Sequence, residues 1–293
     1  MIDSFLRYLT HEKRYSQHTL TSYEHDLLQL TSFLTDHAPE VALETATGLD
    51  LRAWVVSLVE DGLNPRSINR KMATLRSYYK FLLRREVITQ DPTMKLRALK
   101  TAKQLPNFVQ ENDMHRLLDH METPEDFEGW RDRIIVEMLY GTGIRLSELL
   151  GLEEQNIQWN PGTIKVLGKR NKERIIPIPS SLHNSLKMYL RAKKEAFSAN
   201  ASPKIIVNNK GEKGYPMMVY RTVKRYLDLF TTLDKRSPHV LRHTYATHLL
   251  DKGAELNAVK DLLGHASLAA TQVYTHNSLD KLKAVFDQAH PKA

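Results

Sequence analysis

Apolar residues in the first 90 or so positions recur at steps of three and four, the spacing that places them on one face of an α-helix. One helix is expected to begin after Ser16, a favourable N-cap residue, and to run to about residue 33, before Ala38-Pro39 breaks the pattern. A shorter helix is expected through residues 51–58, ending near Asp61-Gly62. The N-terminal part of the chain is therefore predicted to be helical.

The next helix, expected over residues 66–86, combines an apolar stripe with a basic opposite face. The stripe consists of Ile68, Met72, Leu75, Tyr79 and Leu82. Seven basic residues and no acidic one lie between Leu63 and Arg85. Because a solvated face normally mixes both signs, this pattern favours contacts to DNA phosphates over a merely solvated helix. The candidate DNA-binding residues on this face are Arg66, Asn69, Arg70, Ser77, Lys80 and Arg84.

After residue 88 the helical pattern stops, and the remaining chain mixes element types. Residues 89–107 contain two prolines and a basic run, which predicts a linker between a domain of residues 1–88 and one of residues 108–293. Alternating runs at 163–167 and 174–178 predict a β-hairpin, and 204–207 is a candidate third strand. Ser237-Pro238 is expected to open a helix, with the serine hydroxyl as its cap. Other helices are expected over 110–121, 130–141, 145–151, 181–196, 216–230, 255–263, 268–275 and 278–288.

Composition narrows the partners and the chemistry. The 293 residues exceed what one hydrophobic core usually organises, which also favours two domains. The formal charge of +8 favours a polyanionic partner, with nucleic acid ahead of a membrane surface. The absence of cysteine excludes disulfides, thiolate zinc sites and cysteine nucleophiles. Because the sequence shows neither a signal peptide nor an apolar run long enough to span a bilayer, a cytoplasmic protein is expected.

Residues able to cleave a DNA strand without a metal ion occur in the second half. Such cleavage requires fixed cations at the non-bridging oxygens, a nucleophile and a proton donor for the departing oxygen. Taken one at a time, each candidate has a simpler explanation, such as a surface ion pair, a solubilising lysine or a core tyrosine. The candidates are Arg145 after Gly141-Thr142-Gly143, Glu148 three residues on, Lys169 at the hairpin tip, His239 and Arg242 one turn apart, His265 after Leu263-Gly264, and Tyr274.

Together these residues lie in segments that resemble the tyrosine recombinase and integrase family. Gly-Thr-Gly-Ile-Arg-Leu-Ser-Glu-Leu-Leu-Gly-Leu (141–152) resembles the first box of that family, and Ser-Pro-His-Val-Leu-Arg-His-Thr-Tyr-Ala-Thr-His-Leu-Leu (237–250) resembles the second. Leu-Leu-Gly-His-Ala-Ser (262–267) and Val-Tyr-Thr-His (273–276) resemble the ending that carries the nucleophile. Agreement in several parts and in their order is far more specific than one short motif. Arg170 departs from the pattern, since relatives often have glycine in this turn.

The resemblance implies a mainly α fold with a small β-sheet. A helical, SAM-like core-binding domain and a mixed α/β catalytic domain would form a C-shaped clamp on DNA. The tail after Tyr274 carries apolar residues at helical spacing, and in relatives such a helix docks into a neighbouring subunit. Packing of this helix within its own domain is equally compatible with the pattern.

The resemblance also implies roles for the cleaving residues. Tyr274 would attack the scissile phosphate, leaving a 3′-phosphotyrosyl bond and a free 5′-hydroxyl. Arg145 and Arg242 would hold the non-bridging oxygens, and Lys169 would protonate the departing 5′-oxygen.

Three further residues would support this step. His239 would assist proton removal from the tyrosine, whose pKa is ordinarily about 10. His265 would hydrogen-bond the phosphate, and Glu148 would orient the basic groups. No metal or cofactor is implied, because the protein linkage stores the bond energy and rejoining needs neither ATP nor Mg²⁺.

Within the family the chain looks most like the Xer recombinases XerC and XerD, judged by its size and the compact tail. That likeness implies action on a double-stranded DNA recombination site, in chromosome dimer resolution, chromosome partition and cell division during the cell cycle. The implied partners are a homo- or heterotetramer with a paralogous recombinase, and a DNA translocase as activator.

Four other interpretations remain open from the sequence. A phage- or transposon-type integrase uses the same chemistry on another target, and a type IB topoisomerase relaxes DNA by the same mechanism. A non-enzymatic DNA-binding protein would not need Tyr274 or Lys169. A metal nuclease could use His239, His243 and His248, but the chain has no His-Glu-x-x-His motif.

Overall fold

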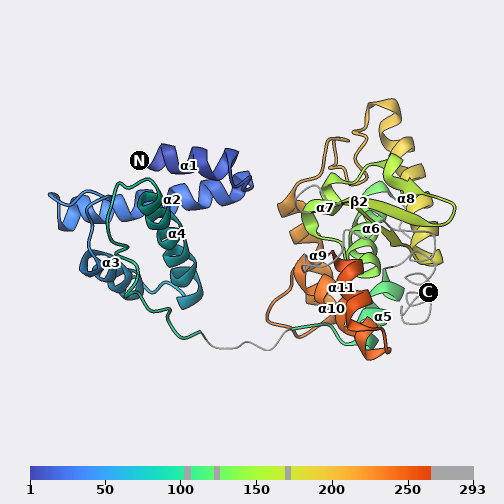
Figure 1. Ribbon diagram of the computed structural model, residues 1–293. Coiled ribbons are helices and arrows are strands. Elements are labelled where there is room, and N and C mark those ends of the chain that lie inside the picture. The colour runs from blue at the N-terminus through green and yellow to red at the C-terminus, as the bar shows by residue number, and fades with distance from the viewer. Residues whose placement is uncertain (102–106, 122–125, 169–172, 265–293) are drawn as a thin grey trace. The chain divides into compact units, whose positions relative to one another are not determined.

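The chain folds into two compact units, Met1–Gln104 and Leu105–Ala293 (Figure 1). The structure, a computed structural model, describes residues 1–101, 107–121, 126–168 and 173–264. Helices dominate the described residues, and three strands form one small sheet. The expected fold class, mainly α with a small β-sheet, is therefore confirmed. No helix in these ranges combines the length and apolar character needed to cross a membrane.

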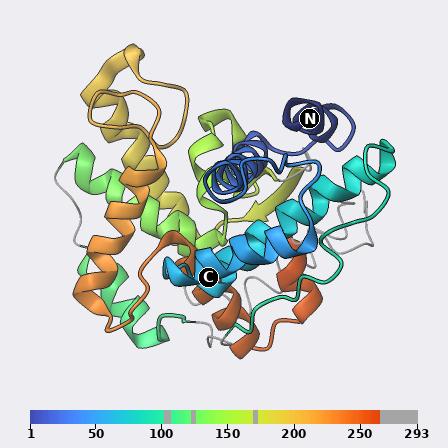
Figure 2. The same cartoon turned by 90° about the vertical axis from the view of Figure 1, so that its left-hand side faces the viewer.

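The first unit consists of four helices, seen from two sides in Figures 1 and 2. They are α1 (Ile2–His11), α2 (Gln17–His37), α3 (Gly48–Glu60) and α4 (Pro65–Arg84). The three predicted helices are confirmed, and the hydroxyl oxygen of Ser16 accepts a hydrogen bond from the backbone N–H of Thr19 as expected of an N-cap. The predicted apolar stripe of α4 is entirely buried in the core of this unit.

The chain beyond α4 continues to pack on the first unit. Leu96 is buried in the core of this unit, and its carbonyl accepts a hydrogen bond from Arg76. Asn69 bonds to both backbone groups of Leu99, at 2.8 and 2.9 Å. The first part of the segment expected to be a linker thus lies against α4.

The second unit is built around α6 (Phe127–Thr142), which is buried along most of its length and packs against four other helices. A helix buried on all sides has no polar face to show, which is why α6 lacks the usual amphipathic pattern. The helices around it include α8 (Ser180–Phe197), α9 (Pro216–Phe230) and α10 (Pro238–Asp251). The remaining helical elements in the described residues of this unit are α5 (Glu111–His120), α7 (Leu146–Gly151), α11 (Leu256–Leu263) and the short 3-10 helices Glu154–Asn156 and Ser198–Asn200.

The predicted β-hairpin is confirmed, but the third strand is not the one expected. Strands β2 (Thr163–Leu167) and β3 (Glu173–Pro177) pair antiparallel, with Val166 opposite Arg174. The outer strand is β1 (Ile157–Gln158), which pairs with β2. Residues 204–207 form only isolated bridges, Glu153 with Lys204 and Val207 with Lys213. Ile205 and Ile206 are buried by packing in the core and not by a place in the sheet.

One expectation about the helices of this unit is wrong in part, and two expected helices lie outside the described residues. Ser237 does occupy the N-cap position of α10 with Pro238 following it, but its hydroxyl makes no capping hydrogen bond, so that part of the prediction was wrong. The helices expected over 268–275 and 278–288, including the C-terminal interaction helix, lie outside the described residues.

A buried carboxylate organises the basic face of α4. Asp26 of α2 is 0% exposed and accepts hydrogen bonds from Arg70, Lys71 and Thr74, at 2.7 to 2.9 Å. Burial alone would raise the pKa of Asp26, but these donors outweigh it and lower the pKa below its ordinary value. The basic face was expected to be unopposed, and this is wrong for Arg70 and Lys71. The opposing charge comes from another helix, where the sequence pattern of α4 does not show it.

We predict that Asp26→Asn destabilises the first unit by about 3 kcal/mol, because it leaves two cations beside a neutral buried group. Such a loss makes hydrogen exchange through unfolding of this unit on the order of 100-fold faster. Exchange measured by mass spectrometry on the full chain should show faster exchange in peptides of α2 and α4, and unchanged rates in the second unit. Asp36→Asn, at an exposed position of the same helix, is the control. Equal effects of both variants would contradict the prediction.

Candidate active site

A left-handed turn brings the first candidate, Arg145, into place. Gly143 follows α6 with φ +59°, a conformation that favours glycine. A Cβ atom at Gly143 would lie 2.4 Å from the Tyr245 ring and 2.9 Å from the Leu263 side chain. Gly143 therefore ends α6 and permits the close approach of these side chains. The chain then turns directly into α7, with Arg145 at its N-cap position.

Glu148 holds Arg145 in this position. Its carboxylate accepts a hydrogen bond from the backbone N–H of Arg145 at 2.8 Å and one from the guanidinium at 2.7 Å. The first of these is half of a capping box, which satisfies a free N–H at the start of α7. Glu148 was expected to orient the basic groups, and its carboxylate bonds to two guanidiniums.

The second guanidinium on Glu148 belongs to Arg174 of β3, which the sequence analysis missed. Its Nη1 and Nη2 donate to the two Glu148 oxygens at 2.9 and 2.8 Å, and its Nε donates to the Leu262 carbonyl at 2.9 Å. Arg174 is 5% exposed. A signal was present in the sequence, because Arg174 shares a strand face with Ile176 and therefore faces the interior.

Arg242 of α10 reaches the same place from the other side. It is buried, and it donates to the Gly143 carbonyl and, at 2.6 Å, to the Leu263 carbonyl. Burial, together with the nearby charges of Arg145 and Arg174, lowers the pKa of Arg242 to about 10 against the opposing effect of Glu148. Its direct partners among the described residues are neutral carbonyl groups, and no carboxylate in that part of the chain bonds to this guanidinium.

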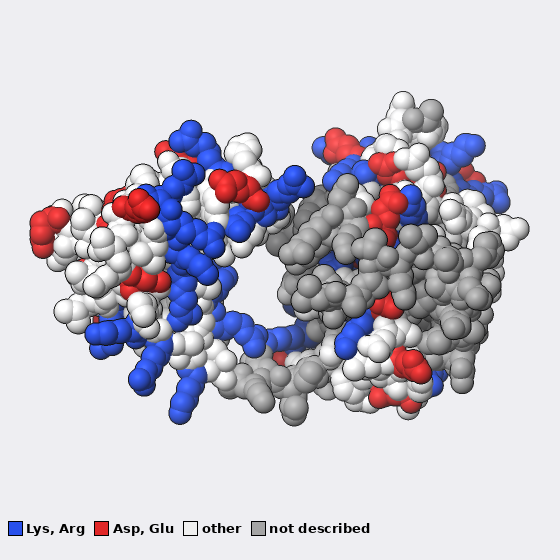
Figure 3. Space-filling view, in the orientation of Figure 1, with Lys and Arg blue, Asp and Glu red and all other residues white. Residues whose placement is uncertain are grey.

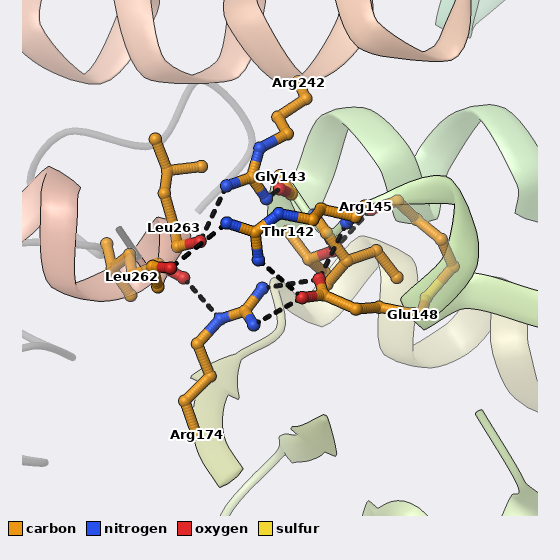
Figure 4. Close-up of polar contacts among 11 residues, drawn as sticks. Thr142, Gly143, Arg145, Glu148, Arg174, Arg242, Leu262 and Leu263 are labelled. Atoms are coloured by element: carbon orange, nitrogen blue, oxygen red, sulfur yellow. Dashed lines mark hydrogen bonds and ion pairs between the residues drawn. The ribbon is translucent and has the colours of Figure 1, made fainter. Parts of the chain in front are cut away.

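The three guanidiniums therefore converge, as Figure 4 shows, although they come from separate elements. Arg145, Arg174 and Arg242 carry three positive charges and Glu148 carries one negative charge, which leaves a local excess of two. Fixed cations held by protein bonds need no rearrangement to stabilise negative charge that develops on a bound group. This arrangement can bind a phosphodiester and stabilise the additional charge of its transition state.

The other expected catalytic residues are placed less completely. His239 is exposed in the first turn of α10, three residues before Arg242. Lys169, His265 and Tyr274, together with Arg170, lie outside the described residues.

The histidines weighed as metal ligands do not form a cluster. His248 is buried, with its ring nitrogens bonded to the Val109 carbonyl and the Tyr140 hydroxyl, both at 2.9 Å. Burial lowers the pKa of His243, and the neighbouring His239 lowers it further. Within the described residues no three His, Asp or Glu side chains are grouped so as to hold a metal ion.

The candidate DNA-binding residues of α4 differ in how they are engaged. Figure 3 shows lysine and arginine side chains gathered on the part of the first unit that contains α4. The side chains of Arg66, Ser77 and Lys80 make no hydrogen bond within the described residues. Arg70 is held by Asp26, and Arg84 donates to the Tyr8 hydroxyl at 2.7 Å. The side-chain amide of Asn69 bonds to the backbone carbonyl and N–H of Leu99. This contact accounts for an asparagine at position 69 without any contact to DNA.

We predict that the Glu148 carboxylate stabilises the second unit in a pH-dependent way. Burial alone would raise its pKa, but Arg174 and Arg145 outweigh burial and lower the pKa of Glu148 to about 2. The carboxylate therefore stabilises the fold above pH 4.5, its ordinary pKa, and the stabilisation is lost as the pH falls from 4.5 towards 2. Glu148→Gln should lower the free energy of unfolding at pH 7 by about 3 kcal/mol.

Urea unfolding at pH 7, 5, 4 and 3 tests this pH dependence, and the difference between Glu148→Gln and wild type should narrow below pH 4.5. Glu173→Gln, which removes an exposed ion pair with Lys165, is the control and should change stability by less than about 0.5 kcal/mol. A difference that stays constant from pH 7 to 3 would refute the charge assignment.

Comparison with solved structures identifies the fold. The chain resembles the XerH site-specific recombinase bound to palindromic difH substrate in a post-cleavage complex, with a TM-score of 0.73 and 20% identity over 97% of this chain and 83% of that one. It also resembles the Tn1549 transposon integrase in complex with transposon right end DNA, with a TM-score of 0.72 and 17% identity over 97% of this chain and 98% of that one. At these identities the likeness concerns the fold alone.

Sequence relatives are similar over their whole length. The tyrosine recombinase XerC of Chlorobaculum parvum is 36% identical over 100% of this chain and 94% of its own. The tyrosine recombinase XerC of Staphylococcus carnosus is 38% identical over 99% of this chain and 97% of its own.

Family models match both units. Residues 2–86 match the phage integrase N-terminal SAM-like domain, and residues 107–280 match the phage integrase family. Together with the relatives and the convergent arginines, these matches show that the chain belongs to the phage integrase family of tyrosine recombinases, the Xer-like site-specific enzymes that cleave and rejoin DNA.

Proposed function

We propose that this recombinase cleaves DNA through Tyr274 at a phosphate held by Arg145 and Arg242. The observation that carries the proposal is the convergence of guanidiniums from α7, β3 and α10, with an excess of positive charge and one shared carboxylate. A phosphodiester has the charge and the paired oxygens that such a cluster binds. We expect no metal ion or cofactor, because these cations supply the charge stabilisation.

The phenolic oxygen of Tyr274 forms a bond to phosphorus as the bond from phosphorus to the 5′-oxygen breaks. His239 assists removal of the tyrosine proton, and Lys169 gives a proton to the departing 5′-oxygen.

The remaining residues support this geometry. His265 donates a hydrogen bond to the phosphate, and Glu148 orients the arginines. The reverse attack by a 5′-hydroxyl restores the phosphodiester and frees Tyr274, with no other energy source.

The two units have separate roles in this proposal. Residues 1–88 form a core-binding domain that contacts DNA through Arg66, Arg70, Ser77, Lys80 and Arg84, while Asn69 holds the backbone at Leu99. Residues 89–107 form the linker, and residues 108–293 form the catalytic domain, which closes with the first domain around the duplex. The C-terminal helix docks onto a neighbouring subunit.

We further infer that the cellular role is chromosome dimer resolution, and with it chromosome partition at cell division. The XerC relatives over the full chain support this role. This role implies a cytoplasmic enzyme that assembles on a double-stranded recombination site as a tetramer, either with copies of itself or with a paralogue. It also implies that a DNA translocase activates the enzyme.

A mobile-element integrase is the second candidate, supported by the likeness in fold to the Tn1549 transposon integrase. Recombination of two supercoiled plasmids with matched or unmatched sites separates the functions. A Xer-type enzyme recombines the plasmids only when both carry its site, whereas an integrase joins two unlike sites. A type IB topoisomerase relaxes either plasmid without exchanging strands between them.

We predict that a nicked suicide duplex traps the enzyme on DNA through Tyr274. The duplex is chosen from a random-sequence pool by binding to this protein, and a nick beside the cleaved position lets the 5′-hydroxyl fragment diffuse away. The covalent adduct should form in EDTA and map to Tyr274 by mass spectrometry. Tyr274→Phe should form no adduct and bind the duplex within about twofold of wild type, since only one hydroxyl is lost.

Tyr220→Phe, at an exposed tyrosine of the same unit, is the control and should form the adduct normally. An adduct on another residue, or one that requires a divalent metal, would overturn the proposed chemistry.

We predict that Arg66→Gln and Lys80→Gln each weaken DNA binding and reduce its salt dependence. Each lost phosphate contact should lower the slope of log K against log salt by about 0.9. Fluorescence anisotropy on one duplex from 50 to 300 mM salt measures this slope. Arg52→Gln, an exposed arginine of α3, changes the net charge equally and serves as control. If Arg52→Gln lowers the slope as much, net charge and not the α4 face determines binding.

A further inference from the structure

The end of α11 is held by the three converging arginines, one for each of three successive residues. The Leu262 carbonyl accepts from Arg174 at 2.9 Å, the Leu263 carbonyl from Arg242 at 2.6 Å and the Gly264 carbonyl from Arg145 at 3.1 Å. Carbonyl groups at a helix C-terminus have no partner within the helix and form its negative end. His265 follows directly, so these bonds determine where the chain toward the nucleophile leaves α11.

Arg174 differs from the other two arginines in what it bonds to. Its two terminal nitrogens bond to the two oxygens of Glu148, so a carboxylate compensates its charge directly. Arg242 bonds only to neutral carbonyls in the described part of the chain, and the Arg145 side chain is 25% exposed. With its charge compensated and its side chain buried, Arg174 is poorly suited to contact DNA itself.

The bonds of Arg174 connect Glu148, which bonds to Arg145, with the end of α11, which bonds to Arg242. Four hydrogen bonds hold the Glu148 carboxylate, two from Arg145 and two from Arg174. Without Arg174 the carboxylate would keep, among the described residues, only its two bonds to Arg145. The Nε of Arg174 meanwhile ties Glu148 and β3 to the last turn of α11.

Gly264 allows this arrangement. It has φ +63°, and a Cβ atom there would lie 3.1 Å from the Cδ and Nη1 atoms of Arg174. Gly264 therefore lies directly against the Arg174 side chain.

We propose that Arg174 is a positioning residue for strand cleavage: it fixes Glu148 and the end of α11 relative to each other, and so aligns the guanidiniums of Arg145 and Arg242 on one phosphate. This inference rests on the proposed function. It requires the shape of the side chain as well as its charge, because only a planar fork can reach both Glu148 oxygens and the Leu262 carbonyl at once.

Arg174→Lys tests the proposal, because it keeps the charge and removes the fork. The rate of adduct formation is measured with the nicked suicide duplex at saturating protein concentration. The temperature is one at which circular dichroism shows each variant to be folded, and the rate is expressed per folded molecule. We expect a rate about 10- to 100-fold below wild type, as is usual for a lost orienting contact, with DNA affinity within about twofold.

A second substrate separates positioning from general damage. A duplex with a methylphosphonate at the scissile position lacks one anionic oxygen, so aligned arginines have less charge to stabilise. The ratio of wild-type to Arg174→Lys rates should therefore be at least several-fold smaller on this duplex. Arg174→Gln, which also removes the charge, should show the same pattern.

Arg131→Lys is the matched control, since Arg131 is also 5% exposed and paired with a carboxylate, Asp132, but within the described residues it shares no hydrogen-bond partner with the converging arginines. It should lower thermal stability and leave the cleavage rate of folded protein unchanged.

Three results would overturn the proposal: a wild-type cleavage rate in Arg174→Lys, an equal loss of rate on both substrates, or an equal loss of rate in Arg131→Lys. If wild-type protein forms no adduct with either duplex, the proposed function itself fails, and this result is distinct from the other three.

Discussion

One carboxylate shared by two guanidiniums is the constraint on which the catalytic unit depends. Glu148 lies buried between Arg145 and Arg174, and a third guanidinium, that of Arg242, lies close by. Three like charges would repel one another strongly in a buried place, and a single carboxylate reduces the repulsion without cancelling it. The positive charge that remains would attract the negatively charged phosphodiester of a bound DNA strand. The same feature that makes this part of the fold costly to bury therefore suits it to the chemistry of DNA strand cleavage.

Backbone carbonyl groups, together with the Glu148 carboxylate, hold the three guanidiniums in position. The carbonyls at the end of α11 and the Gly143 carbonyl orient the guanidiniums without adding a negative charge. Neutral partners are well suited to a site that must keep its positive potential, because a hydrogen bond to a carbonyl directs a donor and leaves its charge in place. Two left-handed glycines, Gly143 and Gly264, let these backbone segments approach closely enough.

The first unit uses a related arrangement for a different purpose. Asp26 is buried beneath the basic face of α4 and holds Arg70 and Lys71, while Arg66 and Lys80 remain exposed. In both units a buried carboxylate from one element sets the direction of cations on another. Long basic side chains lose much conformational freedom when they bind an anion, and a residue that is already held loses less. Such anchoring makes a basic surface more selective in geometry than its net charge suggests.

Local sequence was sufficient for most of the elements and for the residues that belong to motifs. The spacing of apolar residues predicted α2, α3, α4 and the hairpin, because periodicity of three to four or of two reflects which side of an element is buried. The motif resemblance predicted that Arg145 and Arg242 act together. Tertiary structure alone decided the position of the third strand, the anchoring of α4 by Asp26 and the part played by Arg174. Each of these depends on contacts between residues far apart in the chain, such as Arg145 and Gly264, which are 119 positions apart. Periodicity records only whether a side chain is buried, whereas the identity of its partner is determined when separate elements pack together.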